Sequence, residues 1–155
     1  MFCILVVPVL AIAPLPTPPN QIAIKAVQAG KVTSVEDTWL TGSAINQSRG
    51  VVNQGTIKLY IPNTAGSPQY TFNFYNVYGS TVNSSVPIIN IRVNAQWNYI
   101  VNGQVVGTFE GQIEWNYPNA HGNLHGTGIF EGQKLMFWRD TAITGTTWVG
   151  TLTIK

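Results

Sequence analysis

The stretch that decides the fold is INIRVNAQWNYIVNGQVVGTFEGQIEW, residues 89–115. Apolar and polar residues alternate through its first part and again through its last part. Alternation with a period of two is typical of a β-strand that has one buried face. Asn102-Gly103 separates the two runs and is a common turn signal in β-hairpins. The stretch therefore predicts two antiparallel strands that share one dry face.

The length of the turn fixes how the two strands pair. A two-residue loop at Asn102-Gly103 would bring Trp97 opposite Thr108, which belongs to the polar face. A three-residue loop, with Gly103 in the left-handed conformation, pairs residues 100 and 104 and sets large side chains opposite small ones. We therefore expect the three-residue loop and four opposed pairs: Trp97 with Gly107, Ala95 with Phe109, Val93 with Gly111, and Ile91 with Ile113.

Strand-like segments, separated by Gly, Asn, Ser and Pro turns, follow one another after residue 20 without helical periodicity. Eight such segments predict an all-β fold, an antiparallel up-and-down β-barrel of about eight strands, with a β-sandwich as the alternative. Longer loops are expected at 41–50 and 79–86, and a β-bulge is expected at Gln133-Lys134. The expected strands are 21–28, 31–40, 51–61, 69–78, 87–100, 104–117, 124–138 and 146–154.

The N-terminal residues differ in composition from the rest of the chain. Residues 1–13 form an apolar run that resembles the core of a secretory signal, although no Lys or Arg precedes it. The run is too short for a membrane span, which needs about 20 residues. Residues 14–20 are rich in proline and predict a stiff linker. We expect residues 21–155 to form one barrel domain that is secreted or displayed at the cell surface.

Charge is scarce in this sequence. Charged residues make up 9% of the chain, against about 25% in an ordinary soluble domain. The net charge is +2, and the basic residues are scattered rather than gathered in a patch, which does not favour nucleic acid as a partner. The sequence also lacks phosphate-binding, dinucleotide-binding and serine-hydrolase motifs, so no cofactor is expected.

The phrase Phe-Glu-Gly-Gln occurs twice, at residues 109–112 and 130–133. Paired glutamates suit acid–base chemistry or cation binding, but the alternation turns Glu110 and Glu131 away from the apolar face and toward solvent. His121 and His125 lie between the two copies, in an expected turn region. The spacing His-x3-His binds a metal well on a helix, so these two residues are weak metal candidates here.

Aromatic residues are the most informative set, because several alternate with glycine on the face that the strands turn inward. An aromatic-lined barrel holds an apolar ligand or stacks a sugar, whereas a small barrel that fills itself uses the same rings for packing. The residues leave both possibilities open. The candidates for lining a cavity are Trp97, Phe109, Trp115, Phe130 and Trp148.

Two segments, HGTGIFEG at 125–132 and GTFEG at 107–111, resemble the Gly-x-Phe-x-Gly strands of calycin-like barrels of the allene oxide cyclase and dirigent type. The resemblance covers residues 105–155, about a third of the chain. It implies an eight-stranded antiparallel barrel whose central cavity binds hydrophobic or phenolic small molecules. No catalytic residue of those families matches a position here, so the resemblance implies no activity.

The leading hypothesis is an exported, non-catalytic β-barrel that binds an apolar or aromatic small molecule. One alternative is a cell-surface structural or adhesive subunit that self-associates when segment 14–28 adds to the sheet edge of a neighbour. Another is a cofactor-free cyclase or isomerase, which requires a polar residue buried inside the cavity. The residues leave open whether the chain is an enzyme.

Overall fold

The fold is that of a computed structural model, which describes residues 20–34, 37–41, 45–49, 51–62, 66–78, 81–83, 91–116, 119–139 and 147–154. The described residues form strands and turns, and no helix among them is long and apolar enough to cross a membrane. The barrel strands are β1 (Gln21–Ser34), β4 (Val51–Tyr60), β5 (Tyr70–Tyr78), β7 (Ile91–Val101), β8 (Gln104–Asn116), β9 (Asn119–Gly128), β10 (Lys134–Arg139) and β11 (Thr147–Thr153).

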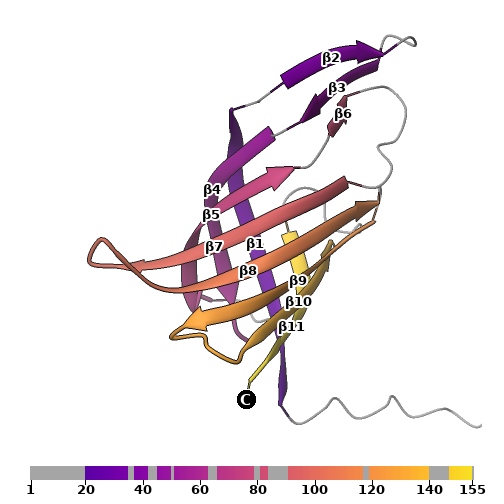
Figure 1. The fold of residues 1–155 in the computed structure, drawn as a ribbon. Coiled ribbons are helices and arrows are strands. Elements are labelled where there is room, and N and C mark those ends of the chain that lie inside the picture. Colours follow the sequence, from indigo (N-terminus) through magenta and orange to yellow (C-terminus); the bar gives the residue numbers. More distant parts are fainter. Residues whose placement is uncertain are drawn as a thin grey trace, which may run out of the picture.

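These eight described strands close into an antiparallel barrel in the order β1-β11-β10-β9-β8-β7-β5-β4 (Figure 1). Each barrel strand pairs with the next barrel strand along the chain, and β1 closes the barrel by pairing with both β4 and β11. The predicted all-β, eight-stranded up-and-down barrel is therefore confirmed, in preference to the sandwich.

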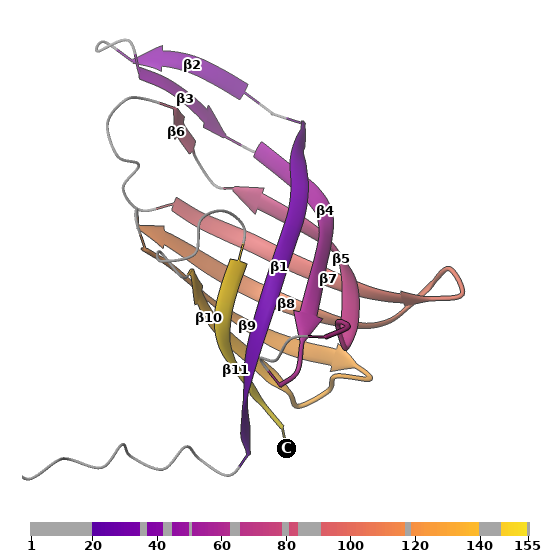
Figure 2. The same ribbon diagram turned by 180° about the vertical axis from the view of Figure 1, so that it is seen from behind.

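Three further described strands form a second sheet, in the order β2-β3-β6. They are β2 (Asp37–Thr41), β3 (Ile45–Arg49) and β6 (Thr81–Asn83), and both views show them beyond one end of β4 and β5 (Figures 1 and 2). The prediction of loops at 41–50 and 79–86 was wrong where β3 and β6 form. Short polar sequences such as INQSR lack the apolar alternation that reveals a strand.

The predicted strand 124–138 is two strands. β9 and β10 pair antiparallel with His125 opposite Lys134, and a turn that includes Gly128 and Gly132 at φ angles of 61° and 79° connects them. The break in alternation near residue 133 is therefore a chain reversal and not a bulge. The turn was not recognised in the sequence because Phe130 continues the apolar alternation. Phe130 is buried like a strand residue, although it lies in the turn between the two strands.

The predicted strand 31–40 does not form a separate barrel strand. Its first residues continue β1 without interruption, and its last residues form β2 outside the barrel. The barrel thus loses one predicted strand here and gains one at the β9–β10 turn, and the total of eight is unchanged.

The β7–β8 turn is the two-residue form, so the predicted three-residue loop was wrong. Asn102 and Gly103 both have positive φ angles, 51° and 79°, and Val101 faces Gln104. Two successive residues with positive φ are the mark of a type I′ turn, in which Asn-Gly is the preferred pair.

A β-bulge next to this turn restores the match of the apolar faces. Ile100 faces Val105 while Tyr99 faces Gly107, so Val106 is the extra residue. The predicted parity, in which odd-numbered residues face odd-numbered residues, is confirmed, but each predicted pair is displaced by two residues. The observed pairs are Trp97 with Phe109, Ala95 with Gly111, Val93 with Ile113, and Ile91 with Trp115.

Glycines on the inner face make room for rings from neighbouring positions. A Cβ atom added to Gly107 would lie 2.8 Å from Cδ2 of Phe130, and one added to Gly122 would overlap the ring of Phe137. Both rings are buried, at 2% and 1% exposure. The gaps beside the aromatic positions are therefore filled by the protein's own rings.

Residues 21–27 pair with β11, and residues 25–34 pair with β4. Most of the predicted strand-adding segment 14–28 thus already has partners in its own barrel. Residues 14–19 and the signal-like run 1–13 lie outside the described residues. Export and self-association through the N-terminal segment stay predictions.

Replacing Asn102 tests the two-residue turn. Alanine is strained at a φ of 51°, so Asn102→Ala should lower the free energy of unfolding by about 1–2 kcal/mol. Asn102→Gly is the matched control and should stay within about 0.5 kcal/mol of the original chain. A three-residue loop would hold residue 102 in the right-handed region, so equal stability of the alanine variant in urea denaturation would contradict the turn.

Candidate functional site

The five aromatic residues predicted to line a cavity come together inside the barrel and belong to one chain of ring contacts. Phe109 stacks on Phe130 with 4.8 Å between the ring centroids. Trp97 stacks on Phe137 at 5.1 Å, and Trp148 meets Phe137 edge-on at 5.3 Å. Trp115, which is partly buried, meets Trp148 edge-on at 6.2 Å. Their shared role in the described structure is to pack against one another, and a ligand cavity between them stays a prediction.

Three buried polar atoms on the inner face have no hydrogen-bond partner among the described residues. They are Oδ1 of Asn53, Oδ1 of Asn76 and Nε1 of Trp97, which we call the inner polar patch. Asn53 and Asn76 face each other across β4 and β5, and Asn76 is 2% exposed. By contrast, Nε1 of Trp148 donates to Oε1 of Gln28 at 3.3 Å. An unpaired buried polar group costs about 1–3 kcal/mol, so each of these atoms would be stabilised by a hydrogen-bond partner.

Tyr78 lies at the end of β5, on the same strand as Asn76. Burial raises the pKa of the Tyr78 phenol above its ordinary value of 10.0, and a hydrogen bond with the Asn53 side chain opposes part of this rise. The phenol is therefore protonated at neutral pH. The Tyr78 hydroxyl and the side-chain amide of Asn53 thus lie next to each other at this end of the barrel.

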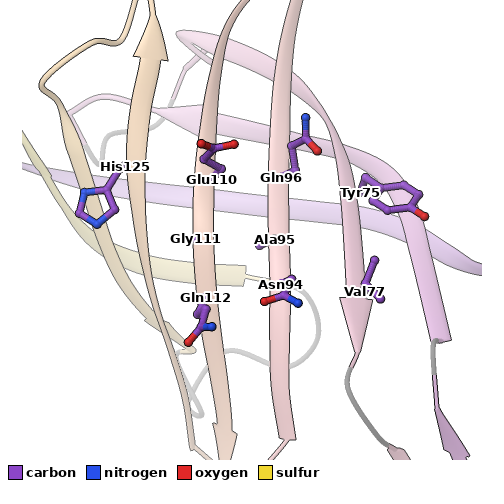
Figure 3. Close-up of a pocket in the computed structure, with 9 residues that line it drawn as sticks. All are labelled: Tyr75, Val77, Asn94, Ala95, Gln96, Glu110, Gly111, Gln112 and His125. Atoms are coloured by element: carbon purple, nitrogen blue, oxygen red, sulfur yellow. The ribbon is translucent and has the colours of Figure 1, made fainter.

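A groove of about 570 Å³ crosses the outer face of the barrel over β5, β7, β8 and β9 (Figure 3). Side chains that alternate with the core point to this face, so strand periodicity supplies the lining. Ala95 and Gly111 belong to the residues that face the core, so they contribute backbone atoms and not side chains to the lining of the groove. The lining residues are Tyr75, Val77, Asn94, Ala95, Gln96, Glu110, Gly111, Gln112 and His125.

Strand register arranges the polar side chains of the groove in two adjacent rows. In the first row Tyr75 faces Gln96, Gln96 faces Glu110, and Glu110 faces His125. In the second row the facing residues are Val77, Asn94, Gln112 and Asn123. The rows set a phenol, side-chain amides, a carboxylate and an imidazole next to one another, although these residues come from four strands.

The groups in the groove are open to solvent. Tyr75 is 42% exposed, and Gln96 donates one hydrogen bond, 3.1 Å long, to Asn98 beside the groove. The prediction that Glu110 and Glu131 face solvent is confirmed, since both are exposed. Glu110 nevertheless lies in the hollow of the outer face, where it can accept hydrogen bonds from a ligand.

His121 and His125 lie in strand β9 and not in a turn. Four residues along a strand separate their Cα atoms by about 13 Å, too far for both to hold one ion. Nε2 of His121 instead lies 3.2 Å from Oε2 of Glu114, and both side chains are more than half exposed. The described part of the chain holds no group of three His, Cys, Asp or Glu side chains that could bind a metal.

Glu110 and Glu114 are also four residues apart in one strand, so their separation is about 13 Å. The carboxylate pairs of glycoside hydrolases are about 5–9.5 Å apart, because both groups must reach the same bond. This spacing therefore does not suit Glu110 and Glu114 for joint acid–base catalysis at one bond.

No protein-family model, curated protein or solved structure matches this chain. The barrel itself is shown by the structure, and the resemblance to calycin-like barrels of the allene oxide cyclase and dirigent type stays a prediction.

The groove was missed by sequence reasoning, which did not single out Tyr75, Asn94, Gln96 or Gln112. Each was visible as an outward position of an alternating strand. What brings them together is the pairing of β5 with β7 and the register of β7 with β8. The first pairing spans the β6 insertion, and the second depends on the bulge at Val106.

Tyr78 makes a pH-dependent contribution to stability. Below about pH 10 the phenol is neutral in both the folded and the unfolded chain. Above that pH the unfolded chain ionises first, so the free energy of unfolding falls until the pH passes the raised pKa of the folded chain. The free energy of unfolding of the Tyr78→Phe variant should decline less steeply with pH than that of the original chain in alkaline urea titrations. Parallel declines of the original chain and Tyr78→Phe would contradict the burial of this phenol.

Proposed function

We propose that this chain is an exported, non-catalytic binding domain whose ligand lies in the outer groove over β5, β7, β8 and β9. The observation that carries the proposal is the lining of that groove, in which hydrogen-bonding side chains from several strands converge beside the exposed ring of Tyr75. Strands hold such side chains more rigidly than loops do, which favours a ligand held in one orientation.

The chemistry of the lining favours a neutral, hydroxyl-rich ligand. Glu110 only accepts hydrogen bonds, whereas the amides of Asn94, Gln96 and Gln112 both donate and accept. A ligand that satisfies all of them has to donate and accept at neighbouring positions, as vicinal hydroxyl groups do. The ring of Tyr75 offers an apolar surface for the C–H face of a sugar. A saccharide fits these requirements.

Binding of neutral saccharides by the purified barrel tests the proposal, with dissociation constants measured by isothermal titration calorimetry. We expect Tyr75→Ala and Gln96→Ala to raise the dissociation constant about tenfold each, equivalent to about 1.4 kcal/mol. Thr71→Ala is the matched control, because Thr71 is exposed on the same strand but outside the groove. Failure of all neutral saccharides to bind, or unchanged binding by Tyr75→Ala, would contradict the proposal.

A second candidate is the predicted apolar or aromatic ligand inside the barrel, and the inner polar patch favours it. The two amide oxygens of Asn53 and Asn76 accept hydrogen bonds, and Nε1 of Trp97 donates. A small molecule with an apolar body and hydrogen-bonding groups would supply partners for these atoms. Asn76 is a buried polar residue, and the cyclase or isomerase hypothesis would also need a cavity around it. A side-chain amide is not a usual proton-transfer group, so we favour binding over catalysis.

Substitution of Asn76 tests this interior ligand. Native mass spectrometry of the gently purified chain should show a bound small molecule, and Asn76→Leu should lose it. Thr71→Leu, on the outer face of β5 and outside the groove, is the control and should keep it. If the original chain carries no added mass and Asn76→Leu is as stable or more stable, the patch needs no ligand partner and the candidate fails.

A further inference from the structure

The outer face carries a second hollow that adjoins the first. It has a volume of about 380 Å³, and its lining adds Glu114, His121 and Asn123. Gly111, Gln112 and His125 line both hollows. Because the hollows share these three residues, they form one continuous depression across β5, β7, β8 and β9, which we call the outer track.

One exposed aromatic ring lines the outer track, and a second lies on the strand next to its other end. Tyr75 on β5 is 42% exposed, and Trp138 on β10 is 50% exposed and faces His121 of the second hollow. Among the large apolar and aromatic side chains that the described residues expose, these are the only two rings. Aromatic side chains are usually buried in a small barrel, so one exposed ring in this depression and another on the strand beside it are informative.

We infer that the ligand of the outer track is an extended neutral oligosaccharide, laid diagonally across the strands from Tyr75 to Trp138, which deepens the proposed function and rests on it. Strands β5 and β10 lie four strands apart in the closed ring of eight, and Trp138 faces His121, four residues along β9 from His125 in the Tyr75 row. The path between the two rings therefore follows the curved wall halfway round the barrel, for about 23 Å at the level of the backbone. One sugar ring cannot touch both ends of such a path. A chain of sugars can stack a terminal unit on each ring while its hydroxyl groups meet the polar rows between them.

Charge on the track argues against a polyanion. Glu110 and Glu114 both face it, and the nearest basic groups in the register are Arg92, opposite Glu114, and Lys134, opposite His125. Two carboxylates balanced by two basic side chains give no excess positive charge, whereas phosphate backbones are bound by a positively charged surface. An anionic polymer would meet both carboxylates.

Hydrogen-bond chemistry argues against a proline-rich peptide, the other polymer that aromatic grooves bind. Proline has no N–H, so such a peptide offers few donors. The carboxylates of Glu110 and Glu114 accept only, and the amide row of Asn94, Gln112 and Asn123 needs both donors and acceptors. Hydroxyl groups repeated along a neutral chain supply both.

The two ends have different expected roles in binding. Tyr75 belongs to the larger hollow, so even a short sugar uses it. Trp138 lies beyond the second hollow and is reached only by a longer chain. Loss of Trp138 should therefore weaken the binding of long chains only, whereas loss of Tyr75 should weaken the binding of every chain. A single sugar site would show no such dependence on chain length.

Calorimetric titration with a neutral oligosaccharide series, from a monosaccharide to a hexasaccharide of the same linkage, tests the inference. In the original chain the affinity should rise about tenfold or more as the series lengthens. Trp138→Ala should remove this rise while it leaves the affinity for short members unchanged, and Tyr75→Ala should weaken every member. Val32→Ala, which removes an exposed side chain of β1 away from the track, is the control and should behave like the original chain.

The outcomes separate this inference from the proposed function. If saccharides bind equally at every length, or if Trp138→Ala keeps the rise with length, the track is wrong and the single groove stands. If no member of the series binds, both fail. Preferential binding of single-stranded DNA or of a proline-rich peptide by the same face would also contradict the inference that the ligand is a neutral oligosaccharide.

Discussion

The packing of aromatic rings into positions left free by glycine is the constraint on which the rest of this barrel depends. The interior of an eight-stranded barrel is just wide enough for side chains, so each large ring needs a small residue beside it. Phe137 occupies the space over Gly122, and Phe130 occupies the space over Gly107. The inner positions are occupied by this packing, and most of the polar residues of the same strands alternate onto the outer face, where they line the groove.

The bulge at Val106 links the core to that surface. It lets the tight turn at Asn102-Gly103 coexist with matched apolar faces, and it also sets which outward residues face each other. With the observed register Glu110 lies opposite Gln96, and the first polar row runs unbroken from Tyr75 to His125. In the predicted register Glu110 would have faced residue 94. One extra residue, selected by core packing, thus determines the order of polar groups in the groove.

The sequence predicted those features that depend on one strand at a time. Alternation located most barrel strands, the inward rings and the outward glutamates, because each of these follows from period two alone. It could not reveal β3 and β6, whose few polar residues show no alternation. The β9–β10 turn was missed because Phe130 is buried between strands, and the outer groove was missed because its residues meet only through pairing of four strands.

The low charge of the chain bears on how tightly such a face can bind. With charged residues at 9% of the sequence, recognition relies on neutral hydrogen bonds, each of which replaces a bond to water and contributes about 0.5–1.5 kcal/mol. An open groove also buries less ligand surface than an enclosed cavity, so a single sugar unit would gain little. Affinity then has to accumulate over several units and two stacking rings. The long shallow path that we propose between Tyr75 and Trp138 is one form of site that meets this need.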